Sequence, residues 1–166
     1  QSGGVFHVRF QAFSNALMGQ GTVRDESVSG ETTESLRVQV AGDTGEATGA
    51  WLASLGTTQT TLRWLPNALT SPMPLVASTF NGRSADLSLA TVSSGTAAFW
   101  AQGAVMPRLV GLSLGSDAGV RDFTPMGVTG LFAPGVTSLD GGVLHVGYEA
   151  DRGTGLDLFG QVVCRP

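Results

Sequence analysis

Short runs in which apolar and polar residues strictly alternate recur along this chain, and this pattern predicts that the chain folds into β-strands. In residues 5–11 every second side chain is apolar, namely Phe6, Val8 and Phe10, and residues 36–40 repeat the pattern. Alternation with a period of two places one set of side chains on each face of a half-buried strand. No long stretch has apolar residues three and four apart, as an amphipathic helix requires. The chain is therefore predicted to be all-β.

Turn signals divide the sequence into many further short strands. Strands are also predicted at residues 50–54, 58–65, 75–80, 85–92, 97–105, 109–114, 143–149 and 156–164. Turns rich in Gly, Asp, Asn or Ser separate them, at residues 42–45, 81–82, 93–95, 140–142 and 153–155. The pair Asn81-Gly82 tolerates positive φ and predicts a hairpin, and only residues 12–18 suggest a helical turn. The spacing favours an antiparallel β-sandwich or small β-barrel with long loops and almost no helix.

The same alternation predicts which side chains form the core. The residues expected to be buried are Phe6, Val8, Phe10, Leu36, Val38, Val40, Leu144, Val146 and Leu158. An unpaired carboxylate is costly to bury, so Val38→Asp is expected to unfold the domain.

Length and charge narrow the class of protein. The 166 residues suffice for one domain with a sizeable core, so a single β domain spanning residues 1–166 is expected. The net charge of −4 does not suit a phosphate backbone, so no nucleic-acid binding is expected. No apolar run approaches the roughly 18–20 residues that span a membrane, so no membrane insertion is expected. The start at Gln1, without a signal peptide, suggests a piece excised from a longer chain.

The residues that carry enzyme chemistry are few. The chain has two histidines, His7 and His145, one cysteine, Cys164, and no G-x-S-x-G nucleophile motif. A single cysteine allows neither an internal disulfide nor a cysteine-based zinc cluster. The acidic residues follow no calcium-loop pattern, and no glycine-rich phosphate loop occurs. We therefore expect no catalytic activity, no metal and no cofactor.

Several segments resemble the protruding domain of calicivirus capsid proteins, in the order found in that family. LRVQV (36–40) followed by LGTTQ (55–59) is similar to one run of the family, and TVSSGTAAF (91–99) is similar to one of its strands. FTPMGV (123–128) resembles its F-T-P-V-G-V motif. Residues 143–166, with DRGTG before LF, resemble its strand, D-T-G turn and following strand.

A second comparison competes with the first. Residues 65–82 resemble the segment before the large loop of a picornavirus-type jelly-roll capsid protein. Both resemblances imply a surface domain of a non-enveloped virus capsid, excised from a longer capsid or surface protein and exposed on the virion outside the cell. Protruding domains of this kind typically form homodimers and bind host glycans or protein receptors. The resemblance thus implies a non-catalytic spike that makes assembly contacts and attaches to host cells.

Two other classes of protein stay open. A carbohydrate-binding or adhesin β-sandwich module of a bacterium or phage could use Trp51, Trp64 and Trp100, which all lie on predicted strands, although tryptophans of sandwiches also form cores. A carboxylate-based glycosidase could use acidic residues such as Glu149 and Asp151.

Three long polar or Gly/Pro-rich stretches are candidates for the receptor surface, because long ordered loops often carry function. They are residues 24–34, 66–74 and 115–122. Arg83 and Arg121 are predicted at or near loop tips, where a guanidinium can grip a carboxylate or an acidic sugar. We expect these two residues, together with Asn81 and Asp117, to form the receptor-binding surface.

Overall fold

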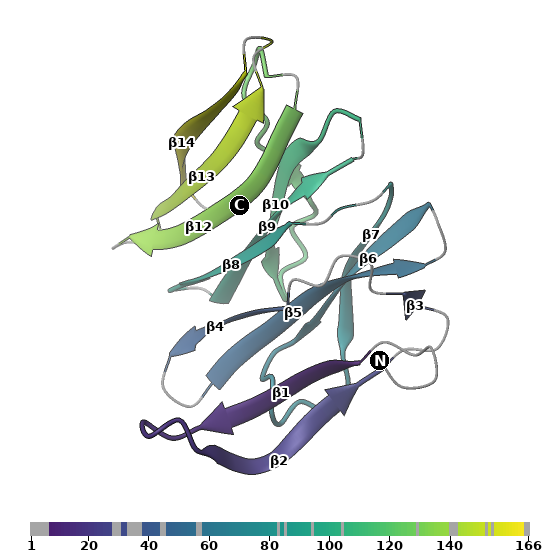
Figure 1. Cartoon of the computed structure of the whole chain (residues 1–166), viewed down its shortest axis with the longest axis vertical. Helices are drawn as coiled ribbons and strands as arrows, with labels where there is room; N and C mark the ends of the chain where they lie inside the picture. The colour runs from purple at the N-terminus through teal and green to yellow at the C-terminus, as the bar shows by residue number, and fades with distance from the viewer. Residues whose placement is uncertain are drawn as a thin grey trace.

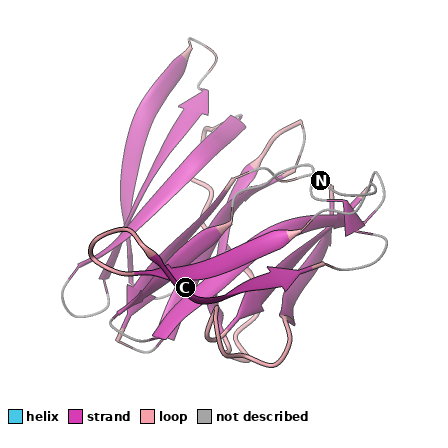
Figure 2. Ribbon diagram, turned by 60° about the horizontal axis from the view of Figure 1, so that its bottom comes forward, coloured by secondary structure: helices cyan, strands magenta, loops and turns pink. Residues whose placement is uncertain are grey.

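The structure is a computed structural model that describes most of the chain. The described residues are 7–27, 31–32, 38–43, 46–55, 58–82, 84, 86–93, 95–103, 105–128, 130–139, 143–151, 153 and 155–164. They form fourteen strands: β1 (Val8–Phe13), β2 (Gly19–Glu26), β3 (Glu31–Thr32), β4 (Gln39–Asp43), β5 (Glu46–Leu55), β6 (Gln59–Leu65), β7 (Leu75–Asn81), β8 (Leu87–Val92), β9 (Gly95–Gln102), β10 (Arg108–Leu114), β11 (Arg121–Asp122), β12 (Gly130–Leu139), β13 (Val143–Asp151) and β14 (Leu156–Cys164). Figure 2 shows strands and loops throughout these residues. None of them forms a helix long and apolar enough to cross a membrane.

Four antiparallel sheets contain all of these strands. β1 pairs with β2. In the second sheet β6 lies between β5 and β7, and the short strands β3 and β4 both pair with β5. The third sheet has the order β11-β10-β9-β8, and the fourth has the order β12-β13-β14. None of them closes into a barrel, so the predicted all-β class is confirmed in its open, sheet-on-sheet form.

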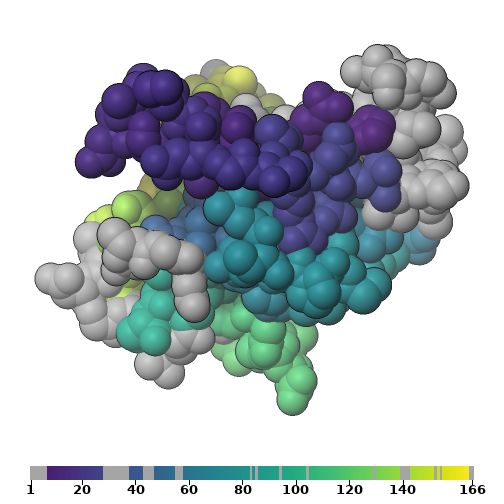
Figure 3. Space-filling model, turned by 90° about the horizontal axis from the view of Figure 1, so that it is seen from below, coloured from purple at the N-terminus to yellow at the C-terminus, as the bar shows by residue number. Residues whose placement is uncertain are grey.

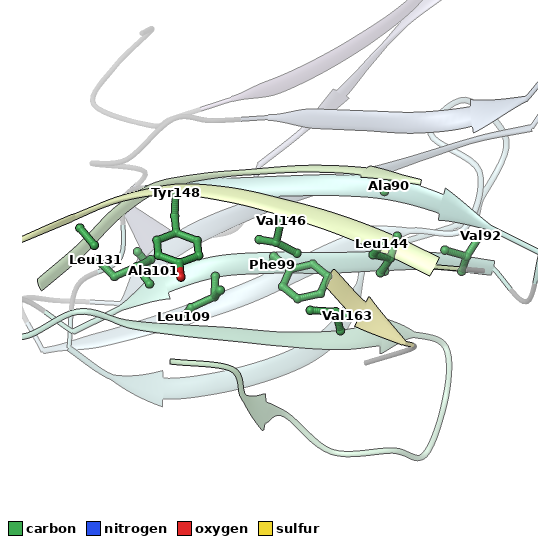
Figure 4. Packing of buried hydrophobic residues seen from close by; sticks show 12 residues of the cluster. Ala90, Val92, Phe99, Ala101, Leu109, Leu131, Leu144, Val146, Tyr148 and Val163 are labelled. Atoms are coloured by element: carbon green, nitrogen blue, oxygen red, sulfur yellow. The ribbon is translucent and has the colours of Figure 1, made fainter. Parts of the chain in front are cut away.

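The sheets are stacked in chain order, with an apolar core between each neighbouring pair (Figure 1). The first core joins β1 to the second sheet and includes Trp51. The second core joins the second and third sheets and includes Leu52 and Trp100. The third core joins the third and fourth sheets around Phe99 and Tyr148 (Figure 4). Each of the two middle sheets therefore buries side chains on both of its faces.

Strand β9 shows what burial on two faces demands of a sequence. Residues 97–101 read Ala-Ala-Phe-Trp-Ala, and all five are buried. Phe99 belongs to the third core, whereas its neighbour Trp100 belongs to the second and stacks on Phe80 with ring centroids 5.7 Å apart. A strand covered on both faces needs a continuous apolar run, and alternation marks a strand covered on one face.

Two long strands lie where no strand was predicted. β2 reads GQGTVRDE and is mostly exposed, because it is the outer strand of a hairpin. β12 reads GLFAPGVTSL, and its register with β13 shifts between Phe132 and Gly135. The prediction of a single loop at residues 24–34 is thus wrong, since this segment contains the end of β2 and all of β3. Backbone hydrogen bonds to a neighbouring strand stabilise such strands even though their sequences lack an alternating apolar pattern.

Two predicted turns also differ from the structure. The hairpin predicted at Asn81-Gly82 is wrong, because β7 ends at Asn81 and β8 belongs to the next sheet. Gly82 does take a positive φ of 98°. However, its N–H donates to the Thr58 carbonyl at 2.7 Å and its carbonyl accepts a bond from Thr60 Oγ1 at 2.7 Å, so it extends the contact with β6. Residues 12–18 hold the end of β1 and the turn into β2, without a helical turn.

Several of the predicted core residues are confirmed and two are wrong. The buried ones are Val8, Phe10, Leu144 and Val146. Val38 is half-buried against the first core. Val40 and Leu158 are exposed, at 54% and 83%. Phe6 and Leu36 lie outside the described residues.

The two wrong predictions have different physical reasons. Val40 belongs to β4, a short strand that pairs with β5 and faces an open groove. In β14 the alternation has the opposite phase to the one predicted: Leu158 lies opposite Glu149, while Phe159 packs against the third core and stacks on Tyr148. Both faces of β14 carry apolar residues, so the sequence of this strand does not predict which face is covered.

Candidate binding groove

An open groove of about 730 Å³ lies between the β1–β2 hairpin and the second sheet. β1 supplies residues 9–13 of its lining, β2 supplies Val23, and the chain around β4 supplies Val38 and Val40. Residues 67–69, just after β6, form a further wall, and Ala47 of β5 completes the lining. Figure 3 views the molecule from the end that carries the hairpin, with the purple residues of the hairpin above teal residues.

The floor of the groove is where the hairpin is fastened to β5. Phe10 of β1 lies directly over Gly49 of β5, so closely that a Cβ atom at Gly49 would come within 2.6 Å of the Phe10 ring. Phe10 also contacts Trp51, with ring centroids 6.0 Å apart and planes inclined at 51°. Val8 and Ala68 belong to the same buried cluster. The missing side chain at Gly49 is what lets the hairpin approach the sheet.

Hydrogen bonds hold the wall that follows β6 in a defined shape. Asn67 Oδ1 accepts bonds from the amides of Leu69 and Thr70, at 3.0 and 3.1 Å. Asparagine suits such a turn because its short side chain can bond nearby backbone. The Ala68 amide donates to the Ala47 carbonyl of β5 at 2.7 Å. The wall is therefore tied to the sheet beneath it.

Arg24 of β2 ties the hairpin to the same wall. Its guanidinium donates to the Ser71 carbonyl oxygen and, from Nε, to Glu26 Oε1 at 2.6 Å. The side chains of Arg24 and Glu26 are only 14% and 16% exposed. A hydrogen-bonded ion pair with so little exposure is costly to break from one side. Arg24 thus links two segments that lie far apart in the sequence.

A charged cluster lies at the rim of the groove. Asp25 accepts bonds from His7 Nδ1 at 2.5 Å and from Arg9 Nε at 2.8 Å. The hydrogen bond from His7, followed by that from Arg9, holds the pKa of Asp25 below its usual range, because both favour the carboxylate. The side chains of His7, Asp25 and Arg9 are 25%, 37% and 64% exposed, so the cluster orients Arg9 at the rim and adds little to the stability of the fold.

The surface that the groove offers to a partner is mainly apolar. Phe13, Val23, Val40 and Leu69 each expose between 43% and 59% of their surface. Several exposed apolar side chains gathered around one hollow often mark a contact site. The arrangement suits an apolar or aromatic group held by shape, with a few polar groups to orient it.

Of the four predicted receptor-binding residues, the three that the structure describes do not line this groove. Arg83 lies outside the described residues. Asn81 lines a separate hollow of about 370 Å³, and Asp117 lines one of about 340 Å³. Both hollows include Val120, which precedes Arg121 of β11. The structure thus places Asn81 and Asp117 in two hollows that share only Val120, and the role of these residues and of Arg121 in binding stays a prediction.

Sequence reasoning missed the groove for an identifiable reason. The end of β2 was expected as part of a loop, no strand was expected at residues 19–23, and Val40 was expected in the core. The useful signal was Phe13 at the end of an alternating strand, followed by Val23 in an otherwise polar segment. Exposed apolar residues on facing segments indicate a hollow only once the pairing of those segments is known.

Two of the three tryptophans are core residues. Trp51 and Trp100 are 3% and 0% exposed, so neither can serve as a platform for a sugar. Trp64 is half-buried and lines the same hollow as Asp117.

The described residues hold no group of three or more His, Cys, Asp or Glu side chains that could bind a metal. His145 and Asp151 lie six residues apart on β13, which separates them by about 20 Å, too far for a catalytic triad. Asp151 Oδ1 accepts a bond from the Gly153 amide at 2.6 Å, the ordinary role of Asp in a turn.

Comparison with known proteins does not assign this chain to a family. No protein-family model, no curated protein and no solved structure matches it. The fold and the groove therefore define the class of protein as an all-β chain of stacked antiparallel sheets. The resemblance to calicivirus capsid proteins rests on its short motifs.

Proposed function

We propose that this chain is a non-catalytic surface domain that works by contact, with the groove beside the β1–β2 hairpin as its attachment site. The observation that carries the proposal is the preformed apolar surface of the groove. Gly49, Asn67 and Arg24 hold its floor and both walls in place. A partner therefore does not have to order the site on binding, which lowers the entropic cost of association.

The setting we infer is the surface of a non-enveloped virus capsid, exposed on the virion outside the cell. The motifs at residues 36–40, 91–99 and 123–128, which are similar to calicivirus protruding domains, support this setting. Only 13% of the residues are charged, which suits a domain held in an assembly of its own copies. In this role the domain forms a homodimer and attaches the virion to a host receptor or glycan.

The groove favours a protein receptor as the host partner. Its walls are apolar, and Asn67 already uses its side-chain oxygen within the wall. An extended receptor segment that inserts an apolar or aromatic side chain fits this lining. One observation favours the alternative, a carbohydrate-binding module: the exposed ring of Phe13 can stack on a sugar.

Val40→Asp tests the groove as the attachment site. Val40 is 54% exposed, so the variant should fold, yet a carboxylate covered by an apolar partner is strongly disfavoured. We expect binding to fall by about tenfold or more. Met126→Asp is the matched control, because Met126 is 98% exposed and lies outside the groove. Purified parent and variants are measured on a displayed peptide library and a glycan array.

Each outcome of that measurement has a distinct meaning. Apolar or aromatic peptides that bind the parent and Met126→Asp, but not Val40→Asp, support the proposal. Glycans with the same pattern support the carbohydrate-binding module. Equal binding by Val40→Asp moves the site elsewhere, and a double Arg83→Ala, Arg121→Ala variant then tests the surface predicted from the sequence. Cleavage of any glycan on the array contradicts a non-catalytic role.

A further inference from the structure

Strand β14 presents a long backbone edge with no described partner. It is the outermost strand of its sheet and pairs only with β13, through nine residues and without a bulge. An outer strand directs alternate N–H and C=O groups away from its sheet. Asp157 is the only charged residue of β14, and the strand contains no proline. Such an edge is a template for pairing with another strand.

Each of the other outer strands of seven or more described residues carries a feature that hinders such pairing. β2 ends in three charged residues, 24–26, and β7 has a bulge in its pairing with β6. Along β12, the Ala133 amide donates to Asp86 Oδ2 at 3.1 Å, and the Val136 amide donates to Ser88 Oγ at 3.0 Å. Charges, bulges and capped amides are the devices that proteins use to protect sheet edges. β14 has one charged residue, Asp157, and among the described residues it has neither a bulge nor a capped amide.

The outward face of β14 is symmetric about its centre. Gly160 is the middle residue of the strand, and Leu158 and Val162 lie two positions to either side of it. These two side chains are 83% and 60% exposed. Leu156 and Cys164, two positions further out, are also exposed. A two-fold axis through Gly160 would therefore set apolar side chains against apolar side chains.

We propose that a second copy of this chain pairs antiparallel with the outer edge of β14, about a two-fold axis at Gly160. In this register Leu158 lies opposite Val162 of the second copy, and Leu156 lies opposite its Cys164. Both pairs occur twice, and cross-strand apolar pairs stabilise antiparallel strands. The fourth sheets of the two copies join into one continuous sheet.

Charge and shape both suit this register. The two Asp157 carboxylates lie toward opposite ends of the paired strands, about 20 Å apart, so no like charges face each other. Gly135, Gly147 and Gly160 lie in register across the sheet. A Cβ atom at Gly135 would meet nothing within 4 Å, so the outward face above this row is open. Pairing at Gly160 continues the row into the second copy without a side-chain collision at the axis.

The inference deepens one part of the proposed function, self-association, and is independent of the ligand. β14 belongs to the sheet at the opposite end of the stack from the β1–β2 hairpin (Figure 1). Pairing through β14 therefore leaves the groove of each copy open to a receptor.

A charge swap on the outward face tests the pairing register. Leu158→Lys with Val162→Lys places two like-charged pairs across the axis, whereas Leu158→Lys with Val162→Glu places two opposite-charged pairs there. Both double variants remove the same two exposed apolar side chains, so they lose the same apolar contacts across the proposed interface. We expect the dimer dissociation constant of the first to exceed that of the second by about tenfold or more. Light scattering coupled to size-exclusion chromatography measures it, and melting temperatures check the fold.

Hydrogen exchange locates the contact. In the parent and the Lys/Glu variant, the outward-facing amides of β14 should exchange slowly, and in the Lys/Lys variant they should exchange fast. A dimer that is equally stable in both variants, or that leaves the β14 amides unprotected, overturns this surface while the proposed self-association stands. A parent that stays monomeric at its highest soluble concentration overturns both. Open-ended fibres would contradict the closed two-fold arrangement.

Discussion

Gly49 is the residue on which the attachment of the outer hairpin depends most directly. A Cβ atom there would lie 2.6 and 2.8 Å from two atoms of the Phe10 ring and 3.2 Å from the Ala68 Cβ. Contacts this short force a buried ring or the backbone to move. Glycine is needed here for close packing and not for an unusual backbone angle.

Gly49→Ala should lower the free energy of unfolding by about 1–3 kcal/mol, because the new methyl group displaces the Phe10 ring. Gly147→Ala is the control, since its Cβ would meet only backbone oxygens at 3.8 and 4.0 Å. That substitution should change the free energy by less than about 0.5 kcal/mol. Urea unfolding followed by circular dichroism measures both, and equal midpoints would contradict the placement of Phe10 over Gly49.

At the scale of elements, the β1–β2 hairpin combines an apolar attachment with a polar internal link. Phe10 and Val8 bury one face of β1 against the second sheet. Asp25 of β2 links back to His7 and Arg9 through its two carboxylate oxygens. The apolar contacts do not titrate, whereas the link through Asp25 requires a carboxylate. The hydrogen bonds of Asp25 should therefore be lost in acid while the apolar packing of the hairpin remains.

The pH dependence of the hairpin follows from the lowered pKa of Asp25. A folded-state pKa below the unfolded one adds stability above the ordinary Asp value of about 3.9. This stability is lost as the pH falls from there through the lowered folded-state pKa. The amide signals of β1 and β2 in nuclear magnetic resonance spectra should therefore shift and broaden in that acid range.

Asp25→Asn is the control for this pH dependence. The variant should show altered β1 and β2 signals already at neutral pH and no further change of these signals in acid. A local readout is needed because the pKa of Asp122 is also lowered: burial raises it, but hydrogen bonds from Thr124 and the charge of Arg108 outweigh burial. An unchanged acid response in Asp25→Asn would assign the effect to another group.

At the scale of the whole molecule, the middle sheets couple the three cores. Phe99 and Trp100 are neighbours in β9, yet they belong to different cores. Loss of either outer layer would expose one face of a strand whose other face is still packed. Shared strands of this kind favour cooperative unfolding, as in most single domains of this size.

Two independent probes of urea unfolding should therefore report the same single transition. The fluorescence of Trp51 and Trp100 reports on the first and second cores, and far-UV circular dichroism reports on all four sheets. The two curves should have the same midpoint at a protein concentration where association is negligible. A fluorescence change that precedes the loss of strand signal would instead mean that the sheets separate before they unfold.

Much of the fold was predictable from residue pattern alone. The alternation around Val8 and Phe10 and at Leu144 and Val146 identified strands and their buried faces, since one covered face requires a period of two. The polar strand β2 and the bulged strand β12 were not predictable, because backbone pairing with a neighbour maintains them. The groove depends on β2 and so was missed with it. The positive φ of Gly82 was recognisable from the Asn81-Gly82 pair, but local chemistry cannot say which sheet the next strand joins.

The sequence by itself determined the all-β class, most strand positions and the scarcity of catalytic groups, because these depend on local periodicity and composition. Only the tertiary structure decided that four sheets stack with three cores, that Leu158 faces outward while Phe159 packs inward, and that Val40 lines a groove. The physical reason is that alternation defines the two faces of a strand but does not determine which of them is buried. That choice depends on which distant segment packs against each face, and it is made only when the whole chain folds.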